Sequence, residues 1–323
     1  MPELYPNMRH GDDAPWHAAK RLIASELREV TLLPRVNPDT RAAVRAIGVR
    51  RWDDERLSAA RLGVHTEAYA RQLDVVLAAN RSPEPVVLPM VFGSADPAWR
   101  ERTPAEFYVD FETVSDLADD FSALPRAGGQ ELIFQIGCGR LNTEGGWQFE
   151  QWTARRLTVA EEGRIIAAWL GHLAEVCGAA GIATRAPRIC HWSGAETSTL
   201  ETAYNAARTR HADEGWPDPD ELSWFDVLNR LVRAEPIGVT GAFGYGLKPI
   251  ARSMAAQGLI RTTWGDGPTD GLGAMVGAFW CDAEAEQTGI PMGELPLMRE
   301  IAGYNEVDCR VMAESLEWLR THR

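Results

Sequence analysis

The spacing of hydrophobic residues divides the chain into a helical front and an α/β body. Apolar positions recur at helical spacing between residues 16 and 81. Prolines then cluster within residues 82–104, which predicts an extended linker. From residue 105 onward, short apolar runs alternate with amphipathic stretches, as in α/β domains. We therefore expect a small all-helical domain over 1–81, a linker over 82–104 and an α/β domain over 105–323.

The α/β body is expected to begin with a three-stranded antiparallel meander. Apolar, β-branched and aromatic runs predict strands at residues 105–112, 131–138, 146–153 and 188–192. Amphipathic periodicity predicts helices at residues 159–178, 196–211, 247–257 and 295–320. Residues 225–232 fit either a helix or a strand, and the Gly-rich segment 265–273 is expected to be a loop.

Composition is ordinary for a globular protein, with 45% hydrophobic and 24% charged residues in 323 positions. The net charge of −13 argues against a general basic surface that coats duplex DNA. It leaves room for a nuclease, because metal-binding carboxylates add negative charge and a local basic groove can coexist with them. Residues 35–81 carry more arginine than acidic side chains, so the helical front is mildly basic and the body acidic.

Cysteine usage and hydropathy favour a cytoplasmic protein. The cysteines are odd in number, widely spaced and without a CxxC pair, so we expect reduced, mostly buried thiols. They are Cys138, Cys177, Cys190, Cys281 and Cys309. No apolar run is long enough to cross a bilayer, and the N-terminal residues lack the apolar core of a secretory signal, so no membrane partner is expected.

Two carboxylates at the end of one predicted strand carry the strongest chemical signal. Asp110 and Glu112 lie within the apolar and aromatic run 106–113. Side chains two residues apart share one face of a strand, and two carboxylates on one face repel each other unless a cation lies between them. The spacing therefore predicts half of a Mg²⁺ or Mn²⁺ site.

A second pair of candidates lies in the last predicted helix, where Tyr304 and Asp308 are four residues apart and share one helical face. This order of motifs resembles the RNase H-like fold of the DEDD 3′–5′ exonucleases. More narrowly, it is similar to the RNase H-like domain found with RecB-type nuclease modules in bacterial proteins. The likeness covers about residues 105–320 and rests on segments 106–113, 191–196, 246–250 and 304–309.

The resemblance implies an RNase H-like mixed sheet flanked by helices, and phosphodiester hydrolysis with two divalent cations, Mg²⁺ or Mn²⁺. In this role Asp110 would bridge both ions, and Glu112 would ligate the ion on the side of the nucleophile. Asp308 would be the ligand from the late helix, and Tyr304 would orient the attacking water. The implied substrate is single-stranded DNA or RNA, trimmed from its 3′ end.

The acid after the fourth predicted strand departs from the usual pattern, which places an aspartate there. The corresponding segment offers Glu196, whose longer side chain can reach the same cation. A rival is Asp226, in a Phe-Asp pair that comes later in the chain. His191 is a candidate for contact with a phosphate or a metal, with a packed histidine at a strand end as the alternative.

Two basic features are candidate phosphate contacts. Lys248, one of only two lysines, would lie in the first turn of a helix, with a solvent-facing role as the alternative. Residues 32–49 resemble a helix-hairpin-helix element, whose backbone N–H groups contact phosphates without reading sequence. Arg35 and Asn37 replace the usual hairpin glycines, and Asn37 is the one expected to tolerate a left-handed backbone. A plain pair of packed helices is the alternative.

The expected function is therefore a cytoplasmic, metal-dependent 3′–5′ exonuclease. Two other classes stay open. One is a catalytically silent nucleic-acid-binding or scaffold protein, which would bind without needing Mg²⁺. The other is a subunit that is active only with a RecB-type nuclease or helicase partner, which activity of the isolated chain would exclude.

Overall fold

The chain folds into two compact units, seen in a computed structural model. The structure describes residues 16–93, 97–115, 132–182, 187–192, 199–265 and 271–323. One unit comprises residues 1–96, 231–259 and 323, and the other comprises residues 97–230 and 260–322. None of the described helices has the length and apolar character needed to cross a membrane.

The first unit is built from helices and one short pair of strands. Its helices are α1 (His17–Leu27), α2 (Pro38–Ala46), α3 (Glu67–Arg81) and α6 (Leu247–Ala256), with a 3-10 helix at Val30–Leu32. Strand β1 (Val87–Leu88) pairs antiparallel with β7 (Gly238–Val239). Buried aliphatic side chains, among them Leu33, Val44 and Leu77, form the core of this unit.

Residues 231–259 belong to the first unit, whereas the expected boundary placed them in the α/β domain. Asn80 of α3 holds this segment, because its Nδ2 donates to the Ala242 carbonyl at 3.1 Å and its Oδ1 accepts the Gly241 N–H at 2.8 Å. Strand β1 lies within 82–104, so part of the expected linker is paired backbone. Contacts between such distant segments leave no periodic signal in the sequence.

The hairpin before α2 differs from the expectation at its two key residues. Arg35, and not Asn37, adopts the left-handed backbone, with φ of 63°. The Arg35 guanidinium lies 3.5 Å from the centroid of the Tyr69 ring, which is a cation–π contact. Asn37 is extended and caps α2, because its Oδ1 accepts the N–H of Thr40 at 2.8 Å.

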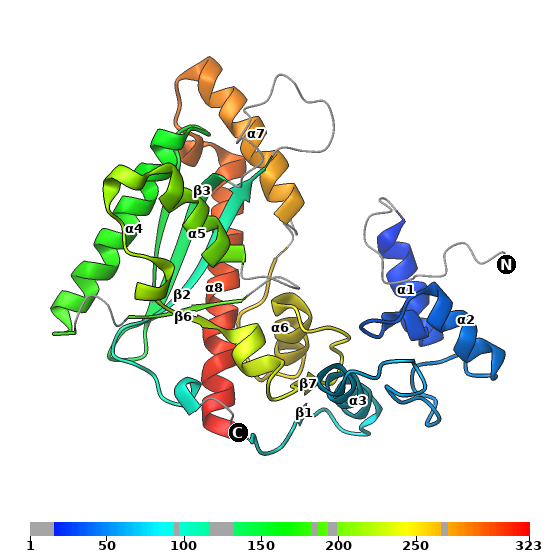
Figure 1. Cartoon of the computed structure of the whole chain (residues 1–323). Helices are drawn as coiled ribbons and strands as arrows, with labels where there is room; N and C mark the ends of the chain where they lie inside the picture. The colour runs from blue at the N-terminus through cyan, green and yellow to red at the C-terminus, as the bar shows by residue number, and fades with distance from the viewer. Residues whose placement is uncertain (1–15, 94–96, 116–131, 183–186, 193–198, 266–270) are drawn as a thin grey trace. The chain divides into compact units, whose positions relative to one another are not determined.

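The second unit is an α/β domain with a mixed five-stranded sheet flanked by helices, as expected (Figure 1). Its strands are β2 (Glu106–Val114), β3 (Leu132–Leu141), β4 (Trp147–Thr153), β5 (Arg188–His191) and β6 (Ser223–Asp226). Their order across the sheet is β4-β3-β2-β5-β6. The predicted antiparallel meander of β2, β3 and β4 is confirmed, and β5 and β6 continue the sheet in the direction of β2.

Helices cover both faces of this sheet (Figure 1). They are α4 (Val159–Ala179), α5 (Thr199–Arg210), α7 (Gly271–Thr288) and α8 (Pro296–His322). Shorter turns are the 3-10 helices Pro97–Trp99, Ala212–Glu214, Pro219–Glu221 and Met292–Glu294 and the π-helix Leu228–Val232. One core lies between the sheet and α4 and α5, and another lies between the sheet and α7 and α8. All five cysteines are buried and form no disulfide, as predicted.

The central strand β2 has different chemistry on its two faces. The side chains that join the α4–α5 core are apolar: Phe107, Val109 and Phe111. Each contributes roughly 1.5–3 kcal/mol by leaving water. The alternate side chains are polar and lie on the α8 face: Glu106, Tyr108, Asp110 and Glu112. One face of the strand therefore packs into the core with α4 and α5, and the other face carries acidic side chains toward α8.

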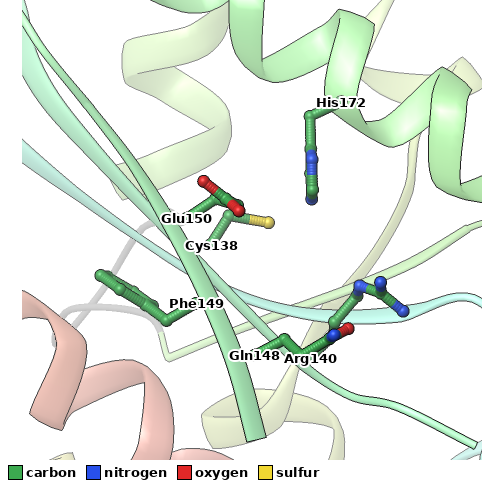
Figure 2. A pocket seen from close by; sticks show the side chains of 6 residues that line it. All are labelled: Cys138, Arg140, Gln148, Phe149, Glu150 and His172. Atoms are coloured by element: carbon green, nitrogen blue, oxygen red, sulfur yellow. The ribbon is translucent and has the colours of Figure 1, made fainter.

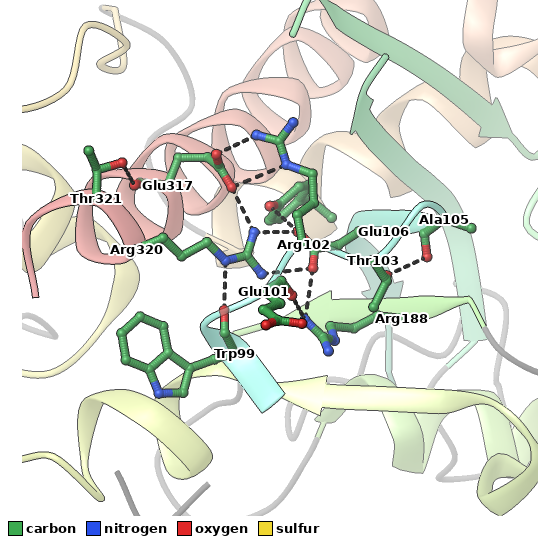
Figure 3. A network of polar contacts seen from close by, with 11 residues as sticks. Trp99, Glu101, Arg102, Thr103, Ala105, Glu106, Arg188, Glu317, Arg320 and Thr321 are labelled. Atoms are coloured by element: carbon green, nitrogen blue, oxygen red, sulfur yellow. Dashed lines mark hydrogen bonds and ion pairs between the residues drawn. The ribbon is translucent and has the colours of Figure 1, made fainter. Parts of the chain in front are cut away.

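A buried carboxylate ties the start of β2 to the end of α8 (Figure 3). Glu106 accepts hydrogen bonds from both terminal nitrogens of Arg320, at 2.7 and 2.8 Å, and from Arg188 at 3.1 Å. The Tyr108 hydroxyl donates to the same carboxylate at 2.6 Å. Burial raises the pKa of Glu106, but the hydrogen bonds and charges of these neighbours, Arg320 first, outweigh it and leave the pKa below its ordinary value.

Replacing Glu106 by Gln should lower the free energy of unfolding by about 3 kcal/mol near neutral pH, because a buried Arg320 loses an anionic partner. A carboxyl with a lowered pKa stabilises the fold above its unfolded-state pKa, and this contribution disappears as the pH falls through the folded-state pKa. The wild type should therefore lose more stability on acidification than E106Q. Urea unfolding at a series of pH values measures this, with Glu300→Gln on the exposed side of α8 as the control. Parallel acid profiles for wild type and E106Q would contradict the assignment.

Candidate functional site

The two predicted carboxylates of β2 lie near the carboxyl ends of the parallel strands. Tyr108 pairs with Cys190, the penultimate residue of β5, so Asp110 lies just beyond the end of that neighbouring strand. Asp110 is partly exposed, whereas Glu112 is only 9% exposed. The carboxyl ends of parallel strands are a common place for ligands in α/β sheets.

A glycine in β3 lets an asparagine of α8 reach Asp110. The completely buried Asn305 donates from Nδ2 to Asp110 Oδ2 at 3.0 Å. Gly137 pairs with Asp110, and a Cβ atom on Gly137 would lie 1.7 Å from Asn305 Oδ1. The amide of Asn305 therefore occupies the space that a side chain at position 137 would fill. Asn305 orients the carboxylate without bringing a positive charge to it.

Asp308 lies one turn further along α8 and is also buried, with 8% of the residue exposed. Its Oδ1 accepts the indole N–H of Trp264 at 2.8 Å. The rings of Trp264 and the half-buried Tyr304 are 6.5 Å apart between centroids. Tyr304, Asp308 and Trp264 therefore form one cluster, in which the orientation of Asp308 is set by a side chain from outside its own helix.

The buried Cys309 thiol lies near both Asp110 of β2 and Asp308 of α8. Burial raises the pKa of Cys309 well above its ordinary value, and the negative charges of Asp110 and Asp308 act in the same direction. Both aspartates thus lie close enough to influence one buried thiol. Residues nearly two hundred positions apart in sequence therefore share one neighbourhood.

His191, at the end of β5, is part of the core. It is fully buried, and its ring meets the Trp224 ring edge-on with centroids 5.4 Å apart. His191 Nε2 lies 3.2 Å from Glu201 Oε1, although within the described part of the chain neither ring nitrogen has the geometry of a hydrogen bond. These contacts agree with the packed strand-end histidine rather than with an open metal ligand.

The remaining candidates occupy three different places. Asp226 ends β6 and accepts hydrogen bonds from Asn229, through the backbone N at 3.0 Å and through Nδ2 at 2.6 Å. It thereby caps the π-helical turn that follows. Glu196 lies outside the described residues. Lys248 belongs to the first unit, in the first turn of α6.

The donor chemistry suits a hard divalent cation. Asp110, Glu112 and Asp308 offer carboxylate oxygens, which are the ligands that Mg²⁺ and Mn²⁺ prefer. In the described ranges, no group of three or more His, Cys, Asp or Glu side chains is gathered closely enough to hold a metal ion. These carboxylates therefore provide part of a ligand set, and the segment that carries Glu196 lies outside those ranges.

Three residues that shape this site were missed by the sequence-based prediction: Gly137, Trp264 and Asn305. A glycine inside a strand often marks the close approach of another group, which was a usable signal for Gly137. Asn305 directly follows Tyr304, and its polarity on a buried helical face was a weaker signal. Trp264 had none, because its partner Asp308 is distant in sequence.

Comparison with known proteins gives no relative for this chain. No protein-family model matches the sequence, and no match is found among curated proteins or solved structures. The functional assignment therefore rests on the residues, their burial and their contacts.

Replacing Gly137 by Ala should displace Asn305 and lower the free energy of unfolding by about 1–3 kcal/mol, because the new methyl group overlaps the amide. The matched control is Gly303→Ala in α8, where a Cβ meets nothing within 4 Å. That change should be neutral or stabilising by up to about 1 kcal/mol, since alanine favours a helix over glycine. Urea unfolding of both variants measures the contrast, and equal stabilities would show that Gly137 does not make room for Asn305.

Proposed function

We propose that this chain is a divalent-metal-dependent nuclease that trims single-stranded DNA or RNA from the 3′ end. The observation that carries the proposal is that Asp110 of β2 and Asp308 of α8 both lie near the buried Cys309 thiol. Asp110 accepts a hydrogen bond from Asn305 of α8. Asp308 of the same helix is buried and is oriented by a hydrogen bond from Trp264. Buried carboxylates such as those of Glu112 and Asp308 are unfavourable unless a cation or a proton compensates them.

The order of elements supports the same proposal. β2 with its Asp-x-Glu pair is followed by β3, β4, α4 and β5, and α8 closes the unit. This is the order that the resemblance to the DEDD exonucleases implies, with β2 central in a mixed sheet. The agreement concerns the positions of elements along the chain, and the chemistry is argued from the side chains.

Asp110, Glu112 and Asp308 are the residues that would hold the cations. Bound Mg²⁺ or Mn²⁺ supplies charge neutralisation at the phosphodiester and activation of water. Asn305 and Trp264 are positioning residues, because they donate hydrogen bonds to Asp110 and Asp308. Tyr304 is half-buried, and its ring lies beside that of Trp264. We propose that its hydroxyl orients the attacking water.

For the remaining acid we propose Glu196 rather than Asp226. Both oxygens of Asp226 are engaged by Asn229, and this contact has a local role at the end of β6. Glu196 follows β5 closely in the chain, and Asp110 lies beside the end of that strand. A carboxylate there would complete the set of acids.

Replacing Asp110 by Asn should abolish metal-dependent cleavage of a 5′-labelled single-stranded oligonucleotide. We expect the cleavage rate to fall at least about 100-fold. Even residues that only hydrogen-bond to metal ligands typically lower metal affinity or activity about 10–100-fold when they are replaced. Denaturing gels of products formed with Mg²⁺, with Mn²⁺ and with EDTA measure the rate and the polarity. Glu300→Gln, an exposed acid of α8, is the control and should cleave like the wild type.

The other outcomes of this assay distinguish the alternatives. Binding without cleavage, unchanged by EDTA, would overturn the proposal in favour of a silent nucleic-acid-binding protein. Cleavage that appears only when a RecB-type nuclease or helicase is added would identify a partner-dependent subunit. Cleavage that survives in D110N would exclude Asp110 as a ligand of the catalytic cations.

A further inference from the structure

A cavity of about 290 Å³ opens at the β4 edge of the sheet, on the face that α4 covers (Figure 2). Its lining residues are Cys138, Arg140, Gln148, Phe149, Glu150 and His172. Gly137 lies on the α8 face with Asp110, so the adjacent Cys138 lies on the opposite face. The cavity and the candidate metal centre are therefore on opposite faces of the sheet.

Two strands present the polar groups of this cavity in register. Cys138 pairs with Glu150, and Arg140 pairs with Gln148, so these four side chains share one face. His172 reaches toward them from α4 (Figure 2). The walls are thus rigid elements, namely two paired strands and a long helix.

Aromatic neighbours hold the imidazole of His172 in place. Its ring centroid lies 5.4 Å from that of Trp152 and 6.1 Å from that of Phe107. Burial lowers the pKa of His172, and the charges of Glu150 and Arg140 act on it in opposite directions. The imidazole is therefore a neutral hydrogen-bonding group near pH 7.

Arg140 and Glu150 are the two formal charges of the cavity, and they do not pair. Opposite charges on diagonal cross-strand positions are close enough to form an ion pair. Neither side chain makes a hydrogen bond or ion pair with any residue that the structure describes. Figure 2 shows the two charged ends directed apart, with His172 opposite.

The other lining groups do not favour a metal ion. Burial raises the pKa of the Cys138 thiol to about 12, so the thiol stays neutral. Cys138, Glu150 and His172 are not gathered closely enough to hold a metal among the described residues, and the Arg140 cation beside them would oppose one.

We propose that this cavity binds a small ligand with an anionic group and an amino group, the first pairing with Arg140 and the second facing Glu150. A guanidinium matches a carboxylate or a phosphate with two parallel hydrogen bonds. A ligand with one positive and one negative group would compensate the charges of both Arg140 and Glu150. A simple anion would pair with Arg140 and lie near an uncompensated Glu150. Gln148 and His172 add neutral hydrogen-bonding groups. The inference does not depend on the proposed nuclease activity.

Ligand-observed saturation-transfer NMR with the full chain tests the proposal, using two matched pairs of probes without added divalent metal. L-alanine and L-lactate differ in a positively charged amino group, as do 2-aminoethyl phosphate and ethyl phosphate. An amino-bearing probe should bind the wild type, and R140Q should weaken it roughly tenfold or more. E150Q should remove the preference over the partner that lacks the amine. Arg299→Gln, an exposed arginine of α8, is the charge-matched control and should behave as the wild type.

Binding of alanine would identify a carboxylate as the anionic group of the ligand, and binding of 2-aminoethyl phosphate would identify a phosphate. The proposal is overturned if no probe binds the wild type, or if R140Q binds as R299Q does. Equal binding of both members of each pair would overturn the assignment of Glu150. Circular dichroism of each variant verifies that a loss of signal is not a loss of fold.

Discussion

The buried ion pair between Glu106 and Arg320 is the interaction on which the α8 face of the sheet depends. Strand alternation puts several acids in one row of β2, and acids buried on one face require compensation. Glu106 receives it from Arg320 and Arg188, and Asp110 receives a hydrogen bond from Asn305. Because Arg320 and Asn305 belong to the same helix, the ion pair at one end of α8 helps to set the position of its middle.

Strand β3 shows how the sheet admits that helix. Gly137 leaves room for Asn305, and Gly139, two residues on, leaves room for the Trp147 ring, which would lie 2.1 Å from a Cβ atom there. The intervening Cys138 faces the α4 side and belongs to the other core. Alternating glycines thus bring α8 and the edge strand close on one face, while the opposite face keeps its side chains. The two faces of one strand serve a candidate metal centre and a separate cavity.

Several arginines of the helical front form ion pairs within the structure. Glu29 is buried and binds Arg41 at 2.8 Å and Arg45 at 3.2 Å. On the surface, Arg51 pairs with Asp53, and Arg56 pairs with Asp54. Arg41, Arg45, Arg51 and Arg56 therefore already have acidic partners, and the exposed pairs among them contribute little to stability. An excess of arginine in a sequence does not by itself identify a phosphate-binding surface.

Local patterns in the sequence determined much of the second unit. Period-two alternation in β2 and period-3.6 amphipathicity in α4 and α8 identified these elements, because both reflect burial of one side of a regular backbone. The same alternation put Asp110 and Glu112 on one face, and helical spacing put Tyr304 with Asp308. Only the tertiary structure decided which groups meet those acids. Asn305 reaches Asp110 through the space at Gly137, and Trp264 reaches Asp308, because strands and helices distant in sequence pack together. The same reason explains the allocation of residues 231–259 to the first unit, since hydrogen bonds to α3 carry no local periodicity.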